Sequence, residues 1–163
     1  QVIRLDPGLA FGTGTHPTTR MCLRWTATHP VAGQRVLDYG CGSGILAIGA
    51  ARFGAGEIDA VDIDPAAVRA TQDNAQANAV ALRAGLPDAA RGEYDTVLAN
   101  ILATPLKVLA PLLCAHVKPG GHLVLAGILE RQAEELQAAY APYLALAVSD
   151  RMDGWILMTG RRP

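Results

Sequence analysis

The sequence predicts an α/β domain with a mainly parallel sheet. Apolar runs of strand length alternate with stretches of helical periodicity, and a glycine-rich turn follows the first of these strands. The chain has 163 residues, half of them hydrophobic, and a formal charge of −1. That length fits one domain, and the composition excludes a disordered chain and a strongly basic nucleic-acid-binding surface.

The first half of the chain is predicted to hold a helix followed by two strand–helix units. A loop rich in Gly and Thr covers residues 7–15, and Pro17 suits the first position of a helix that ends near residues 29–30. Glycines at 54 and 56 end the second helix, and Pro65 begins the third. The predicted elements are a helix at 17–29, a strand at 35–38, a helix at 45–53, a strand at 57–62 and a helix at 65–78.

The second half is predicted to complete the sheet, with helices on both faces, and to close it with an antiparallel hairpin. Residues 79–92 are weakly patterned, and we expect a short strand at 81–83 and a loop at 86–88. Pro111 must kink or split a helix at 105–117, because proline lacks the backbone N–H and clashes with the preceding turn. The glycines at 120–121 are expected to end this helix. The remaining predictions are strands at 94–99 and 122–126, a helix at 129–140, and a hairpin of 144–150 with 155–160.

A glycine-rich loop with the pattern G-x-G-x-G follows the first strand. Gly40 and Gly42 let the backbone turn tightly and approach a ligand, and Asp38 stands just before them. The dinucleotide fingerprint is G-x-G-x-x-G, and the carboxylate would repel its pyrophosphate. The loop therefore favours a ligand that presents a cation, such as the ammonium group of S-adenosylmethionine. A nicotinamide dinucleotide is the alternative, and Asp38 could instead serve as a turn or helix-dipole partner.

Two acidic residues close the second strand. Asp62 follows Gly40 by 22 residues, and a carboxylate at this strand end can accept hydrogen bonds from both hydroxyls of a ribose. Asp64 stands directly before Pro65, where Asp is a common helix N-cap. We assign Asp62 to the ribose and Asp64 chiefly to capping.

The remaining residues give no sign of a metal site, a disulfide framework or a membrane span. The three cysteines form no CxxC pair and the four histidines have no ligand spacing, so we expect reduced thiols in the cytoplasm and no metal. The apolar stretch at 97–117 contains Asn100, Lys107 and two prolines, which is typical of a buried strand followed by a helix. Trp25 and Trp155 are expected in the core or at a domain interface.

Four segments of the chain resemble the ribosomal protein L11 methyltransferases, which are class I S-adenosylmethionine-dependent enzymes. The longest is LDPGLAFGTGTHPTT at residues 5–19, and the others are residues 38–46, 62–65 and 99–102. The resemblance covers essentially the whole chain, down to residues 155–161, and it is to the catalytic domain of that family.

The resemblance implies a Rossmann-like, seven-stranded sheet and methyl transfer from S-adenosylmethionine to lysine and N-terminal amines of a large-subunit ribosomal protein. The family has a further N-terminal domain that captures this protein, and we expect residues 1–163 to be the methyltransferase domain without it. The positions similar to the family's cofactor contacts are Phe11, Gly12, Thr19, Gly40, Gly42, Asp62 and Asn100.

Methyl transfer from a sulfonium needs an aligned lone pair and the exclusion of water, but no nucleophilic side chain. Asn100 is the candidate for holding the substrate amine. Residues 100–103 occupy the place of the Asn/Asp-Pro-Pro-Tyr motif but lack its prolines and aromatic ring, which favours an aliphatic amine over a nucleobase. His16 is a candidate base or gate, or else a capping or packing residue. Another protein lysine, a small amine or a non-catalytic cofactor-binding fragment remain alternatives; neither nucleic acid nor membrane is expected as a partner.

Overall fold

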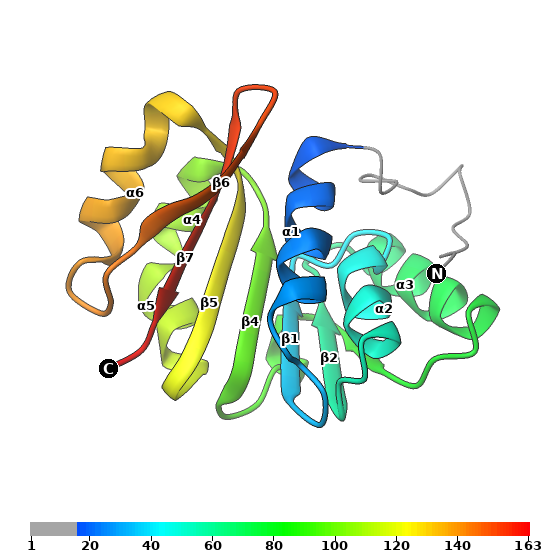
Figure 1. Ribbon diagram of the computed structural model, residues 1–163. Helices are drawn as coiled ribbons and strands as arrows, with labels where there is room; N and C mark the ends of the chain where they lie inside the picture. The colour runs from blue at the N-terminus through cyan, green and yellow to red at the C-terminus, as the bar shows by residue number, and fades with distance from the viewer. Residues whose placement is uncertain (1–15) are drawn as a thin grey trace.

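The computed structural model describes residues 16–163, whose strands form one seven-stranded sheet in the order β3-β2-β1-β4-β5-β7-β6 (Figure 1). Neighbouring strands from β3 to β5 are parallel, whereas β7 runs antiparallel to both β5 and β6. The predicted parallel sheet with an antiparallel end is therefore confirmed. The strands are β1 (Arg35–Tyr39), β2 (Glu57–Val61), β3 (Arg83–Gly85), β4 (Tyr94–Asn100), β5 (Val117–Leu129), β6 (Ala147–Met152) and β7 (Trp155–Arg161).

Helices cover both faces of this sheet (Figure 1). Successive side chains of a strand point to opposite faces, so Val36 of β1 packs under one helical layer and Leu37 under the other. The first layer contains α1 and α2 with α3 beside them, and the second contains α4, α5 and α6. Their bounds are α1 (Pro17–Thr28), α2 (Ile45–Arg52), α3 (Pro65–Ala77), α4 (Ala103–Val108), α5 (Ala110–Ala115) and α6 (Ala133–Tyr140), with 3₁₀ turns η1 (Pro87–Ala89) and η2 (Glu130–Gln132).

The helix expected at 105–117 is split, as predicted, but the break falls at Leu109. Pro111 then lies in the first turn of α5, where its missing N–H removes no helical hydrogen bond. The helix also begins earlier than expected, at Ala103.

Several other boundaries differ from prediction because strand pairing overrides the local pattern, and β6 covers Ala147–Met152 and not 144–150. β5 begins at Val117, which pairs with Tyr94, and the glycines at 120–121 lie inside a register irregularity before His122 pairs with Thr96. α6 begins only at Ala133, because β5 continues until Leu129 pairs with Trp155. The short third strand lies at Arg83–Gly85 and not at 81–83.

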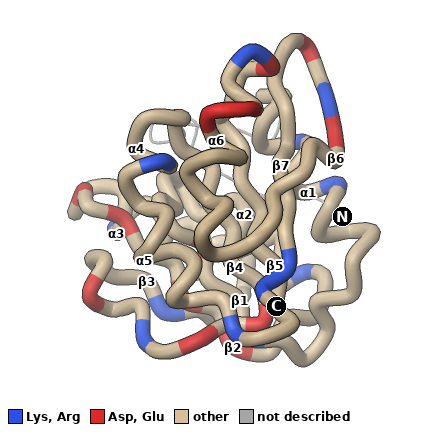
Figure 2. The backbone as a smooth tube through the Cα atoms, turned by 90° about the vertical axis from the view of Figure 1, so that its left-hand side faces the viewer, with Lys and Arg blue, Asp and Glu red and all other residues tan. Residues whose placement is uncertain are grey.

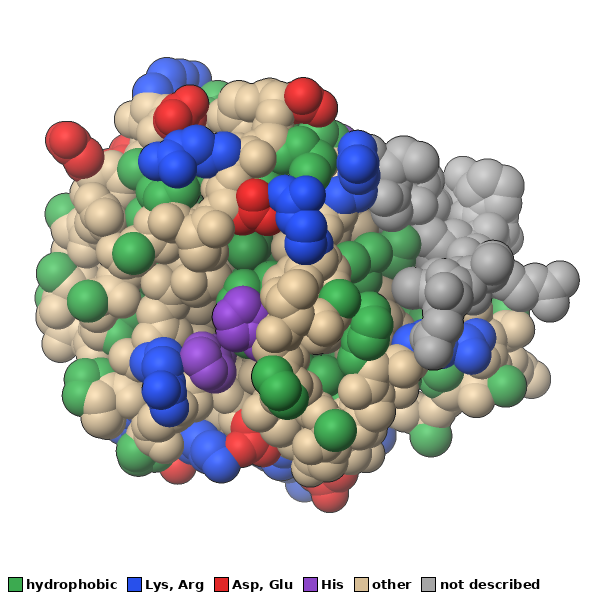
Figure 3. Space-filling view, in the orientation of Figure 1, with side chains coloured by type: hydrophobic (Ala, Val, Ile, Leu, Met, Phe, Trp, Pro, Cys, Tyr) green, Lys and Arg blue, Asp and Glu red, His purple; other side chains and the backbone are tan. Residues whose placement is uncertain are grey.

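The C-terminal turn of α1 is attached to β5 by aromatic packing. Trp25 stacks on His29 with ring centroids 4.2 Å apart, and His122 meets the Trp25 ring edge-on at 5.4 Å. Two neighbouring histidines are visible on this face (Figure 3). Burial, together with Arg161 and His29, lowers the pKa of His122, so this ring packs in its neutral form at neutral pH.

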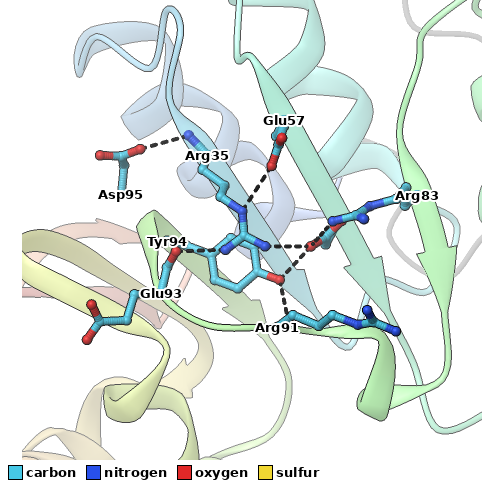
Figure 4. Close-up of polar contacts among 8 residues, drawn as sticks. Arg35, Glu57, Arg83, Arg91, Glu93, Tyr94 and Asp95 are labelled. Carbon is cyan, nitrogen blue, oxygen red and sulfur yellow. Dashed lines mark hydrogen bonds and ion pairs between the residues drawn. The ribbon is translucent and has the colours of Figure 1, made fainter.

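A buried carboxylate joins four strands toward their amino-terminal ends (Figure 4). Asp59 of β2 is 2% exposed, and it accepts hydrogen bonds from the Tyr94 hydroxyl at 2.5 Å and from Arg83 Nε at 2.8 Å. The Arg35 guanidinium lies 4.0 Å from the centroid of the Tyr94 ring. Since a buried charge is unfavourable unless it is paired, these groups fix β1, β3 and β4 around Asp59.

Acidic and basic residues are interspersed along the backbone at this edge and in the β6–β7 hairpin (Figure 2). Within residues 16–163, no helix is long and apolar enough to cross a membrane. In the same part of the chain, no three His, Cys, Asp or Glu side chains come together as a metal site.

Replacement of Tyr94 by Phe should destabilise the fold by about 1.5–3 kcal/mol, because it leaves the buried Asp59 carboxylate with one donor fewer. Denaturant unfolding measures the change. Tyr143→Phe is the matched control, since that side chain is 40% exposed and should change stability by less than about 0.5 kcal/mol. Equal effects of the two substitutions would contradict the role given to the Asp59 cluster.

Candidate functional site

The carboxyl ends of β1, β2 and β4 meet where the strand order reverses, which is where open α/β sheets bind ligands. A cavity of about 550 Å³ lies at this place. Its lining comes from the loops after these three strands, the start of α1, the first turns of α3, a bulge in β5 and the start of β7. The lining residues are His16, Thr18, Gly40, Gly42, Asp62, Asp64, Ala66, Ala67, Ala70, Asn100, Ile101, Leu102, Pro105, Gly127 and Trp155.

A second cavity of about 610 Å³ opens on the α4 side of the same strand ends. Gly40, Asp62 and Ile101 line both cavities, so the two adjoin along the glycine loop. The second lining is almost entirely apolar and includes Ile63, whose side chain is 80% exposed. This cavity therefore suits an apolar group.

The glycine loop passes between the two cavities with backbone that other residues rarely adopt. Gly40 has φ +80°, and a Cβ there would lie 2.6 Å from Cγ2 of Ile101. The absence of a side chain at Gly40 thus permits both the turn and the close approach of Ile101.

Asp38 lies behind this loop and does not line the cavity. Its Oδ2 accepts a hydrogen bond from the Ala47 N–H in the first turn of α2, at 3.2 Å. Gly44, the N-cap of α2, has no side chain for that purpose. Asp38 is 1% exposed, its Oδ1 has no hydrogen-bond partner among the described residues, and burial, with a smaller effect of Asp62, raises the pKa of this carboxyl to about 7. The structure therefore places Asp38 as a support for α2.

Asp62 links the glycine loop to the end of β2. Its Oδ2 accepts a hydrogen bond from the Gly42 N–H, and its Oδ1 accepts one from the Asp64 N–H, both at 3.0 Å. A carboxylate has about four acceptor positions, so two remain for a ligand. Asp64 accepts from the Ala66 N–H at 2.9 Å, and its predicted role as the N-cap of α3 is confirmed.

Asn100 ends β4 and faces the cavity, and a threonine behind it holds its amide. Asn100 Nδ2 donates to Thr19 Oγ1 at 3.4 Å, and Thr19 is 1% exposed on α1. Thr18, rather than Thr19, is in the lining. The structure thus brings together Gly40, Gly42, Asp62 and Asn100, with Thr19 one layer behind; Phe11 and Gly12 lie outside the described residues.

Trp155 and Gly127 are among the lining residues that were not recognised from the sequence. Trp155 is half-buried at the cavity and meets the His16 ring edge-on, with centroids 5.6 Å apart, although it was expected in a core or domain interface. Gly127 lies in a bulge of β5 with φ +89°, and a Cβ there would overlap the Ile101 carbonyl. An isolated glycine inside a strand was the available signal for the bulge, whereas no local signal marked Trp155.

Comparison with known proteins points to one family. A family model described as "Ribosomal protein L11 methyltransferase (PrmA)" matches residues 1–163. A protein of that name from Polaromonas sp. is 74% identical over 164 residues, covering 99% of this chain and 55% of the relative. Another from Bordetella parapertussis is 62% identical over 159 residues, covering 97% and 52%. The chain therefore spans about half the length of the curated relatives it matches.

A solved structure agrees with this comparison. The crystal structure of ribosomal protein L11 methylase from Lactobacillus delbrueckii subsp. bulgaricus superposes with a TM-score of 0.90 and is 34% identical. The match covers 99% of this chain and 86% of that one. The same fold and the same family are thus reached from the sequence and from the coordinates.

Gly127→Ala should destabilise the protein more than Gly33→Ala does. Both glycines have positive φ, so either alanine costs about 1–2 kcal/mol of backbone strain. A Cβ at Gly33 meets nothing within 4 Å, whereas one at Gly127 requires the Ile101 backbone to move. Denaturant unfolding of the two variants checks the difference, and equal losses of stability would show that the close approach at Gly127 is unimportant.

Proposed function

The chain belongs to the ribosomal protein L11 methyltransferase family, and from this premise we propose that it transfers methyl groups from S-adenosylmethionine to amines of ribosomal protein L11. The acceptors in this proposal are lysine side chains and an N-terminal amine. The observation that carries it is the convergence of Gly40, Asp62 and Asn100 from three strand ends on one cavity. The same three positions are those that the family resemblance assigns to the cofactor.

The residues present fit S-adenosylmethionine. Asp62 retains acceptor positions for the ribose hydroxyls, and Gly40 and Gly42 line the cavity beside it, where the methionine part would lie. The apolar second cavity, with Ile63 and Val108 in its lining, would hold the adenine ring. We assign Asp38 an indirect role, because it supports the loop from behind. When bound, this group supplies an electrophilic methyl on a sulfonium.

Asn100 is the residue that we assign to the substrate amine. Its Nδ2 is directed to Thr19, so Oδ1 is the end that can accept an N–H of the incoming amine and orient the nitrogen lone pair. A lysine amine has an ordinary pKa of about 10.4 and must lose a proton before it attacks. Leu102 and Trp155 line the same space with apolar surface, which favours the uncharged amine.

Asp62→Ala should weaken the binding of S-adenosylhomocysteine about 10- to 100-fold, the equivalent of a lost hydrogen bond to a charged group. Isothermal titration calorimetry measures the dissociation constant. Asp73→Ala is the control, since Asp73 is an exposed carboxylate on α3 and does not line either cavity. A dissociation constant for Asp62→Ala within twofold of the unaltered chain would refute the ribose assignment.

We propose that residues 1–163 form the methyltransferase domain and that capture of L11 depends on a separate N-terminal recognition domain. The relatives that match this chain are nearly twice its length, which supports the division. Acidic and basic residues are interspersed along the described backbone (Figure 2), and the chain has 14 Lys and Arg against 15 Asp and Glu, so its composition supplies no excess of acidic charge for a basic protein. A ribosomal substrate, together with three free, buried cysteines, supports a cytoplasmic location.

Fusing the N-terminal part of the Polaromonas relative to this chain should raise methyl transfer to L11 at least tenfold at low substrate concentration. A linked recognition domain raises the local substrate concentration to about the millimolar range. Radiolabelled methyl transfer is compared between chain and fusion at equal enzyme concentration. If the chain alone matches the fusion, recognition of L11 lies within residues 1–163.

A further inference from the structure

His16 stands at the rim of the cavity, where its ring nitrogen caps α1. His16 Nδ1 accepts a hydrogen bond from the Thr18 N–H at 3.2 Å and lies 2.7 Å from the Thr18 hydroxyl. The backbone of His16 is extended, and Pro17 is the first residue of the helix, which is the usual geometry of an N-cap.

This capping contact determines which ring nitrogen carries the proton. A backbone N–H can only donate, so Nδ1 must be the bare, accepting nitrogen, and the Thr18 hydroxyl can donate to it as well. In a neutral imidazole the other nitrogen, Nε2, then carries the hydrogen. His16 therefore has no free lone pair on the side of its ring that faces away from α1.

The same contact links His16 to the substrate end of the site. The first turn of α1 carries Thr18 in the cavity lining and Thr19 behind Asn100, whose Nδ2 donates to Thr19 Oγ1. A loosened first turn would release the group that holds the Asn100 amide. The other titratable side chains in the described lining are Asp62 and Asp64. Asp62 accepts from the Gly42 and Asp64 N–H groups, and Asp64 accepts from the Ala66 N–H.

We propose that His16 is a positioning residue: through its Nδ1 cap it orders the first turn of α1 and so the amide of Asn100, and it does not accept the proton of the substrate amine. This inference rests on the proposed function for the identity of the amine. The amine proton passes to solvent before the nitrogen attacks, so no histidine base is required.

Two substitutions distinguish a helix-capping role of His16 from a role as general base. His16→Asn removes the imidazole but keeps a side-chain oxygen that caps helices well, whereas His16→Ala removes both. Methyl transfer to saturating L11 is measured across pH, with thermal unfolding and calorimetric binding of S-adenosylhomocysteine for each variant. We expect His16→Asn to keep kcat within about threefold, with an unchanged pH–rate profile and melting temperature, and His16→Ala to lower both kcat and melting temperature.

A general base contributes about 10²- to 10⁴-fold to the rate, so a loss of that size in both variants, with a changed pH–rate profile, would overturn the proposal. Nitrogen-15 chemical shifts of the His16 ring give a readout that does not depend on activity. The proposal requires a bare Nδ1 and a protonated Nε2 at neutral pH, and the opposite tautomer would refute it. If the unaltered chain neither binds S-adenosylhomocysteine nor transfers methyl groups, the proposed function fails, while the ring nitrogens and the melting temperatures still decide the role of His16.

Discussion

The loop after β1 turns at three glycines of positive φ, and two carboxylates fix the loop and the helix that follows it. Asp62 accepts the Gly42 N–H from the cavity side, and Asp38 accepts the Ala47 N–H from the core side. Glycine backbone is free to adopt positive φ but loses much conformational entropy when it is fixed. The two acidic side chains offset that loss by giving the loop and the following helix directed partners. Every other part of the site is arranged around the position of this loop.

The Asn100 side of the site is positioned by contacts of a different kind. Ile101 follows Asn100 and is enclosed between Gly40 and Gly127, at both of which a Cβ would collide with it. Thr19 then fixes the amide of Asn100 from the buried side of α1. Close packing positions the backbone at Asn100 and Ile101, and one hydrogen bond orients the Asn100 side chain. The Asp62 side of the site thus depends on carboxylate acceptors, whereas the Asn100 side depends mainly on shape.

Local patterns in the sequence identified most elements of the sheet and the strand-end residues of the cavity. Proline and glycine positions marked the starts of α1 and α3 and the loop at Gly40, because those residues act on their own backbone. Local patterns did not predict the contacts between segments that are distant in the sequence. Nothing near Leu129 indicates that it pairs with Trp155, and Asp38 precedes the glycine loop in sequence but faces the opposite side of it. The face of a strand to which a polar side chain points depends on how that strand pairs and packs in the sheet.

The edge contact between His16 and Trp155 joins the first helix to the last strand of the described chain. His16 and Trp155 both line the cavity and are far apart in the sequence. This part of the cavity wall therefore forms only after the strands between them have assembled into the sheet. Gly40 and Asp62 precede Trp155 in the sequence, and the cavity lacks the Trp155 side chain until β7 has joined the sheet. Without β7 the protein would lose part of the cavity wall and also the strand that connects β6 to the rest of the sheet.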